Sequence, residues 1–262
     1  MKRPTLCLPI LLAATSSARS ILATSQRSSE LTDDFDGPAQ WKFTLQNWSG
    51  DGCPDFGNTS ATPGYSFTRQ SSGPFMSNSS ADTFWSYISF PWMQASLDGN
   101  NPSKLARISC DVTVLYEEVT PYGSALPPEK RTHKLKLHKN GSTIEANYKL
   151  DKGVNAEWQV RFYDPQDFTV MAQDWASVDG PLESGNDTHM AFEWLPPLFA
   201  PDPYVQSECG RSVFRIRLDL WLASRATGAG GKVFSKRTDW NNGKGKQWDG
   251  VNLGYSYDWE KC

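Results

Sequence analysis

Long runs that alternate apolar and polar residues constrain this chain most, because they require strands rather than helices. In residues 106–118, ARISCDVTVLYEE, every second position is apolar: Ile108, Cys110, Val112, Val114 and Tyr116. The run SVFRIRLDLWLAS, residues 212–224, alternates in the same way, with Arg215, Arg217 and Asp219 on its polar phase. A period of two puts successive side chains on opposite faces of a strand. Each run therefore predicts a half-buried β-strand.

Two further stretches extend this pattern. EWQVRFY, residues 157–163, alternates over its whole length, and HKLKLHKNGSTIEANYKL, residues 133–150, is typical of two strands joined by a turn at KNG. Helical spacing is sustained nowhere, and Gly and Pro separate the alternating runs. We therefore predict an all-β fold, an antiparallel two-sheet β-sandwich with jelly-roll-like connections, formed by one domain over residues 39–262.

The first residues are typical of a secretory signal peptide. Lys2 and Arg3 precede a short apolar run at 6–14, and small residues follow at Ser16 and Ala18. We predict a signal peptide over residues 1–18 and a polar, flexible leader over residues 19–38. No later run approaches the roughly 18 apolar residues of a membrane helix. The mature protein is therefore expected to be secreted, extracellular and without a membrane partner.

Cysteine content fits this compartment. Cys7 would leave with the signal peptide, and four cysteines remain: Cys53, Cys110, Cys209 and Cys262. An even number in a secreted protein predicts two disulfides, for which three pairings are possible. We favour Cys110 with Cys209, because a core-facing strand cysteine and a cysteine that leads into the most regular strand could bridge the sandwich, and hence Cys53 with Cys262. The wide spacing does not suit zinc, so no metal is predicted.

Acceptor triplets for N-glycosylation are more frequent than chance would give. They lie at Asn47, Asn58, Asn78, Asn140 and Asn186. A glycan is bulky and solvated, so these five segments are predicted to lie on the surface of a secreted glycoprotein.

Four cysteine-containing motifs occur in order: GDGCP at Cys53, RISCDVTV at Cys110, SECGRSVFRIRLDL at Cys209 and WEKC at Cys262. With FPWMQASLDG and LDKGVNAEWQVRFY, they resemble the secreted, largely fungal family catalogued as domain of unknown function 4360. The resemblance covers residues 48–262. This sequence departs from the family pattern at three places. The segments after Cys53 and at VTPYGSALPPEKRT are longer than those of the family, and Glu208 stands where a Pro is expected. It implies a secreted β-fold and no known activity.

Motifs for catalysis are weak. The three histidines lack metal-ligand spacing. His133 is in phase with the apolar side chains of its strand, His138 points outward with the lysines, and His189 lies in a loop, so we expect structural or solvent-facing roles for them. No G-x-S-x-G elbow is present. Glu117 and Glu118 are adjacent and point to opposite faces of a strand, while Asp164 and Asp167 flank Pro165 in a predicted turn. No catalytic residue and no cofactor are therefore predicted.

Tryptophan is abundant, with eleven residues, and the C-terminal segment carries Trp240 and Trp248 among Asn, Gly and Asp. Aromatic faces beside amides suit sugar rings, so these two and the outward-phase Trp221 are possible carbohydrate-binding residues. The competing interpretation assigns Tyr255, Tyr257 and Trp259 to a final strand whose rings lie in or over the core.

Charge excludes further classes of partner. The formal net charge is -3, without the basic concentration that nucleic acid requires. We favour a non-catalytic module associated with cell-wall glycan or another polysaccharide. A glycoside hydrolase or lyase on a sandwich scaffold and a secreted effector that binds a host protein are the alternatives, and the oligomeric state is not predicted.

Overall fold

The alternating runs form the strands that the sequence predicts. The computed structural model describes residues 37–54, 84–100, 103–182, 204–239 and 247–262, apart from the side chains at 139–140, 204–205, 207, 236–239 and 247–249. The strands are β1 (Trp41–Ser49), β2 (Phe84–Phe90), β3 (Ala95–Leu97), β4 (Leu105–Glu118), β5 (His133–Glu145), β6 (Asn147–Leu150), β7 (Val154–Tyr163), β8 (Val170–Asp179), β9 (Tyr204–Cys209), β10 (Arg211–Ser224), β11 (Gly231–Phe234), β12 (Lys236–Asp239) and β13 (Gln247–Lys261). A short 3-10 turn, η1 (Pro128–Lys130), precedes β5.

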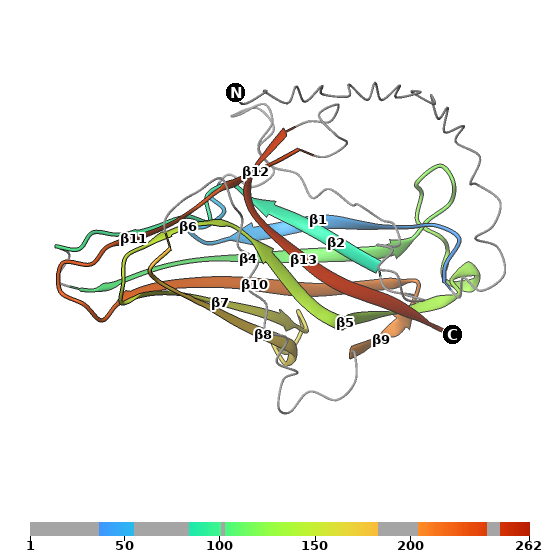
Figure 1. Ribbon diagram of the computed structural model, residues 1–262. Coiled ribbons are helices and arrows are strands. Elements are labelled where there is room, and N and C mark those ends of the chain that lie inside the picture. The colour runs from blue at the N-terminus through green and yellow to red at the C-terminus, as the bar shows by residue number, and fades with distance from the viewer. Residues whose placement is uncertain (1–36, 55–83, 101–102, 183–203, 240–246) are drawn as a thin grey trace, which may run out of the picture. The chain divides into compact units, whose positions relative to one another are not determined.

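The strands form three antiparallel sheets (Figure 1). The large sheet has the order β1-β4-β10-β7-β8. A second sheet has the order β12-β13-β5-β9, and β2 also pairs with β13. A small third sheet, β3-β11-β6, was not predicted. Among the described residues there is no α-helix, and no helix is long and apolar enough to cross a membrane.

Aromatic side chains fill the space between the large and second sheets. Phe43 on β1 meets Tyr257 on β13 with ring centroids 4.9 Å apart, and Phe162 and Phe214 each lie 5.9 Å from Tyr255. Both tyrosines are fully buried. The two faces therefore share one core, and the predicted antiparallel β-sandwich is confirmed.

Tryptophans join the sheets by hydrogen bonds as well. Within the described part of the chain, three indole N–H groups donate to phenol oxygens: Trp41 to Tyr257 at 3.0 Å, Trp158 to Tyr148 at 2.8 Å and Trp259 to Tyr116 at 2.9 Å. In each pair the two residues belong to different sheets. The interpretation of Trp259 and its neighbouring tyrosines as core residues is thus confirmed.

The predicted hairpin at KNG is wrong, because β5 runs straight through it. Tyr257 pairs with Leu137 and Tyr255 with Ser142, so residues 138–141 bulge opposite the single residue Ser256. His138 and Gly141 have φ of 67° and 77°, and the Ser256 hydroxyl donates to the Gly141 carbonyl at 2.8 Å. Positive φ angles absorb the extra residues without reversing the chain.

The bulge also corrects the role expected of His138. Its side chain does not point outward with the lysines but is only 8% exposed, with Nε2 2.7 Å from Oδ2 of Asp174 on β8. His133 is buried as predicted, and His189 lies outside the described residues.

The favoured disulfide pairing is wrong: Cys53 bonds to Cys110, and Cys209 bonds to Cys262. β10 runs antiparallel to β4 so that Arg211 pairs with Glu117, seven residues from Cys110. This register puts Cys209 about 20 Å along the sheet from Cys110, whereas a disulfide requires Cα atoms within about 7 Å. The disulfide pairing depends on how β4 and β10 are aligned, and the alternation of apolar and polar residues within each strand carries no information about that alignment.

The GDGCP motif is explained by its contact with β4. The Gly52 amide donates to the Ser109 carbonyl at 2.8 Å, and Asp51 Oδ1 accepts the Ser109 amide at 3.0 Å. At Gly50, with φ of 120°, a Cβ atom would stand 2.3 Å from the Ser109 carbonyl oxygen. Only glycine allows this approach, which delivers Cys53 to Cys110.

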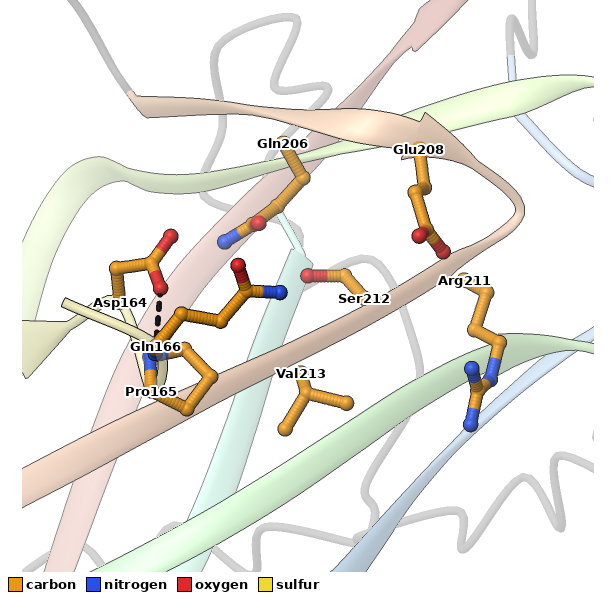
Figure 2. Close-up of a pocket in the computed structure, with 8 residues that line it drawn as sticks. All are labelled: Asp164, Pro165, Gln166, Gln206, Glu208, Arg211, Ser212 and Val213. Atoms are coloured by element: carbon orange, nitrogen blue, oxygen red, sulfur yellow. Dashed lines mark hydrogen bonds between the residues drawn. The ribbon is translucent and has the colours of Figure 1, made fainter.

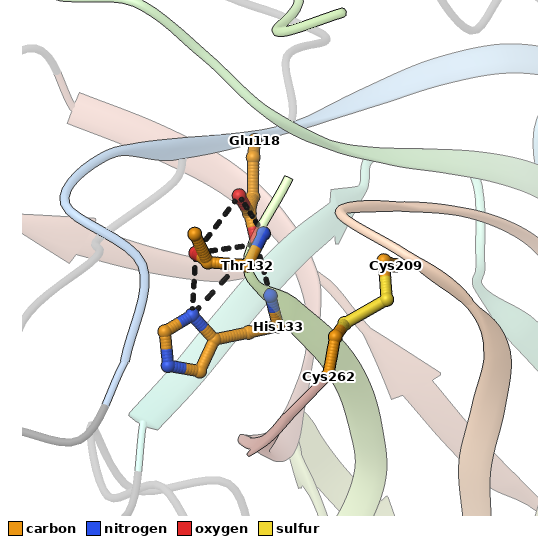
Figure 3. The surroundings of a disulfide bond; sticks show 5 residues. All are labelled: Glu118, Thr132, His133, Cys209 and Cys262. Carbon is orange, nitrogen blue, oxygen red and sulfur yellow. Dashed lines mark hydrogen bonds and ion pairs between the residues drawn. A yellow bond between two sulfur atoms is a disulfide. The ribbon is translucent and has the colours of Figure 1, made fainter. Parts of the chain in front are cut away.

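At the other disulfide, a buried carboxylate holds the start of β5 (Figure 3). Glu118 accepts hydrogen bonds from the backbone amides of Thr132 at 3.0 Å and His133 at 2.7 Å. The Cys262 amide donates to the Thr132 carbonyl at 2.9 Å, beside the bond to Cys209. The last residue is therefore fixed by covalent and hydrogen bonds.

The predicted signal peptide, residues 1–18, and residues 19–36 of the leader lie outside the described residues. All described residues belong to one compact unit, Asp36–Cys262. Asn47 is exposed on β1, and Asn140 lies in β5 without a described side chain. Asn58, Asn78 and Asn186 fall outside the description.

Candidate functional site

The outward side of the large sheet gathers charged, amide and aromatic side chains on neighbouring strands. Phe214, Ile216 and Leu218 of β10 point into the core, so Arg215, Arg217, Asp219 and Trp221 point outward. Register places side chains of β4, β7 and β8 beside them. We call this surface the β10 face; its members are Arg107, Asp111, Glu157, Gln159, Arg161, Tyr163, Trp175, Arg215, Arg217, Asp219 and Trp221.

Asp219 is the centre of the β10 face. Its side chain is fully buried, and its oxygens accept hydrogen bonds from Arg107 at 3.0 Å and Arg161 at 2.7 Å. Arg217 binds it in a bidentate manner, through Nε at 2.9 Å and Nη2 at 3.2 Å. Burial acts to raise the pKa of Asp219, but hydrogen bonds from the three guanidinium groups outweigh burial and lower that pKa below its ordinary value.

Aromatic rings support the guanidinium groups. Arg107 lies over the ring of Trp221 at 5.2 Å, and Arg161 lies 5.7 Å from the ring centroid of Tyr163. Arg215 stacks on Phe168 at 4.9 Å and binds Asp111 at 2.8 Å. Stacking and pairing restrict the rotamers of these long side chains. The guanidinium groups are therefore held in place on the sheet.

Trp175 is the most accessible ring on the β10 face. It lies on β8, 54% exposed, and pairs with Gln159 of β7, which pairs in turn with Asp219. Trp221 is half-buried, with Arg107 over its ring. From strand spacing and register, the Cα atoms of Trp175 and Trp221 are about 12 Å apart. An exposed indole beside amide and guanidinium donors can stack on a sugar and bind its hydroxyls.

A polar pocket of about 160 Å³ lies beside the start of β10 (Figure 2). It forms where β7 ends, between β9, the start of β10 and the turn at 164–169. In Figure 2 the side chains of Gln166, Gln206 and Ser212 point toward one another. Ser212 Oγ is buried and has no hydrogen-bond partner among the described residues. The pocket can therefore offer neutral polar groups to a small ligand.

Two carboxylates, Asp164 and Glu208, also line this pocket. Asp164 Oδ1 accepts the Gln166 amide at 2.7 Å, and Asp167 Oδ1 accepts the Thr169 amide at 2.9 Å. The predicted turn at YDPQDF is thus confirmed. Glu117 and Glu118 diverge as expected, since Glu117 faces Lys42 at 3.5 Å while Glu118 is buried.

Sequence reasoning found only part of this site. Of the predicted aromatic residues, Trp221 lies on the β10 face, Trp240 lies outside the described residues, and Trp248 belongs to β13 without a described side chain. Trp175, Arg161 and the pocket were missed. Within the described ranges no group of three or more His, Cys, Asp or Glu could hold a metal ion.

Comparison with known proteins assigns no family. No family model matches the sequence, and no curated protein matches it. Among solved structures, the chain is similar to the carbohydrate-binding module TmCBM61, described in complex with β-1,4-galactotriose. The match has 11% identity, a TM-score of 0.20, and covers 82% of this chain and 88% of that one. A likeness at this level supports no functional argument.

Proposed function

We propose that this protein is a carbohydrate-binding module that binds polysaccharide along the β10 face. The observation that carries the proposal is the exposed indole of Trp175, on the same sheet face as Gln159 and the fixed guanidinium groups. From Val213 to Trp221, eight residues of β10 extend about 27 Å along this face. A surface of that length suits a chain of sugars better than a single small molecule.

Two indoles allow a matched test of this proposal. Trp175 and Trp92 are similarly exposed, at 54% and 51%, but Trp92 lies in the turn after β2 and not on the β10 face. We expect Trp175→Ala to lower affinity for the bound glycan about tenfold, which corresponds to about 1.4 kcal/mol. Trp92→Ala should bind like the unchanged protein.

Pull-down on chitin, β-glucan, mannan and pectic polysaccharide, followed by calorimetry on the glycan retained, measures these affinities. Trp221→Ala should have a smaller effect than Trp175→Ala, because Arg107 already covers the ring of Trp221. Retention of every glycan by Trp175→Ala at unchanged affinity would show that the β10 face is not the binding surface.

We also propose that the protein is secreted and N-glycosylated. Two disulfides support an oxidising compartment, and the exposed Asn47 is accessible to a glycan. N-terminal sequencing of the secreted protein should begin at Arg19, and enzymatic deglycosylation should lower its intact mass. A chain that retains residues 1–18 would contradict cleavage.

Hydrolysis is a second candidate, favoured by the two carboxylates that line the pocket. Glycosidases require two acids in one cleft, roughly 5 to 10 Å apart. Asp164 and Glu208 line one pocket together with Gln206 and Ser212. If the protein cleaves a polysaccharide, Asp164→Asn and Glu208→Gln should each abolish cleavage and leave binding through Trp175 unchanged.

A further inference from the structure

We infer that the polysaccharide bound by the β10 face is acidic, and that its anionic groups bind Arg107, Arg161 and Arg217. The inference rests on the proposed function and specifies the ligand class. Three guanidinium groups surround one carboxylate, so the cluster has a local formal charge of +2. The cluster would attract uronate or sulfate groups and discriminate against a neutral chain.

The three guanidinium groups are more exposed to solvent than the carboxylate that they surround, which strengthens the attraction for an anionic ligand. The Asp219 side chain is 0% exposed, whereas those of Arg107, Arg217 and Arg161 are 49%, 33% and 24% exposed. A ligand that approaches the sheet therefore meets guanidinium groups and not the carboxylate beneath them. Asp219 orients the three cations, and their charge faces the ligand.

The number of unused hydrogen-bond donors on the three arginines also favours an anionic ligand. Asp219 already accepts four hydrogen bonds: two from Arg217 and one each from Arg107 and Arg161. Each guanidinium has five N–H donors, so most donors of the cluster are not used by Asp219. Anionic oxygens satisfy such donors better than sugar hydroxyls do.

Acidic residues lie around the cluster formed by Asp219 and its three arginines. Asp111 is paired with Arg215 at 2.8 Å, and Asp51 accepts the Ser109 amide beside β4. Glu157 pairs with Trp221 in the β-ladder, on the side away from Arg107. Since Glu157 repels an acidic ligand, its neutralisation should strengthen binding.

Polygalacturonate and its fully methyl-esterified form provide the decisive comparison, because they differ in charge but share one sugar backbone. We expect the esterified chain to bind the full-length secreted protein at least about tenfold more weakly. Affinity for polygalacturonate should fall when ionic strength rises from about 0.01 M to about 0.15 M. Dextran sulfate distinguishes carboxylate from sulfate as the group recognised. If it binds more tightly than polygalacturonate, and if Arg107→Gln weakens its binding, the protein recognises sulfate esters.

Three charge variants complete the test. Arg107→Gln should weaken binding of polygalacturonate about fivefold while Arg161 and Arg217 still hold Asp219, and Glu157→Gln should strengthen binding about twofold. Lys149→Gln removes an exposed charge from β6, off the β10 face, and should have no effect. A thermal melt of each variant shows that it is folded.

Two negative outcomes are distinguishable. Equal affinity for the charged and esterified chains, with Trp175→Ala still defective, overturns the inference of an acidic ligand and leaves the proposed function standing. If neither acidic nor neutral polysaccharides bind, both the inference and the proposed function fail.

Discussion

Trp259, three residues from the C-terminus, donates a hydrogen bond to the phenol oxygen of Tyr116 across the sandwich, at 2.9 Å. The donor is on β13 of the second sheet and the acceptor on β4 of the large sheet. Trp41 with Tyr257 and Trp158 with Tyr148 repeat this arrangement. Directional bonds between the sheets thus supplement the less directional packing of the core.

The first prediction concerns this bond. Tyr116→Phe keeps the ring and removes the acceptor, so it should lower the free energy of unfolding by about 1 to 2 kcal/mol. Urea denaturation measures the change. Tyr122→Phe is the control, because Tyr122 is 95% exposed and its hydroxyl should contribute nothing measurable. Equal stabilities for the two variants would contradict a role for the Trp259 bond.

Buried phenols predict a loss of stability in alkali. Burial raises the pKa of Tyr148 to about 12, against an opposing hydrogen bond from Trp158. Burial also raises the pKa of Tyr116, Tyr255 and Tyr257. Unfolded tyrosine titrates near pH 10, so the unfolded state loses protons first above that pH. Stability is therefore retained below about pH 10 and falls as pH rises from about 10 toward 12.

For Tyr148 alone this loss amounts to about 2 to 3 kcal/mol across the window. Urea denaturation between about pH 8 and about pH 11 should show the decline begin near pH 10. Tyr148→Phe should make the decline shallower, whereas Tyr122→Phe should not. A flat profile up to about pH 11 would count against burial of these phenols.

Asp219 should be costly to neutralise. Asp219→Asn leaves Arg107, Arg161 and Arg217 without their shared counter-charge, and we expect a destabilisation of about 3 kcal/mol at neutral pH. Because the pKa of Asp219 is lowered in the folded state, its contribution is present above the unfolded value of about 3.9 and is lost as pH falls further. The stabilities of the two proteins should therefore converge in acid, as thermal melts can show.

Removal of either disulfide should also destabilise the fold. The bonds span 57 and 53 residues of sequence, and in the chain-entropy model each contributes about 4 kcal/mol. Paired Ser substitutions at Cys53 and Cys110, or at Cys209 and Cys262, should each lower the urea midpoint. Peptide mapping of the unreduced protein checks the connectivity, and a peptide that joins Cys110 to Cys209 would refute it.

The alternation in the sequence was sufficient to predict β4, β7 and β10 and the outward position of Trp221. It could not predict partners, because Arg107 and Asp219 are 112 residues apart in sequence and meet only through the register of two strands. The same limit explains the wrong disulfide pairing. Membership of the family resembled by the four cysteine motifs stays a prediction.

The failure to predict Trp175 as a site residue has a local structural cause. In β8 the burial pattern is irregular, with Met171 and Ala172 both buried, and the β7-β8 register shifts between Phe162 and Tyr163. A bulge of this kind interrupts the period of two. Residues 170–179 therefore lack the regular alternation that identified the other strands, although Trp175 itself points outward.

The disulfide connectivity also determines the order in which the two native bonds can form. Cys53 and Cys110 are successive cysteines in the sequence, as are Cys209 and Cys262, so the two disulfide-closed loops do not overlap along the chain. If the chain is translocated into an oxidising compartment during synthesis, as we propose, the first pair can close before the second pair has been synthesised. Cysteines that oxidise in the order of their emergence reach the native pairing directly, with no requirement for disulfide isomerisation.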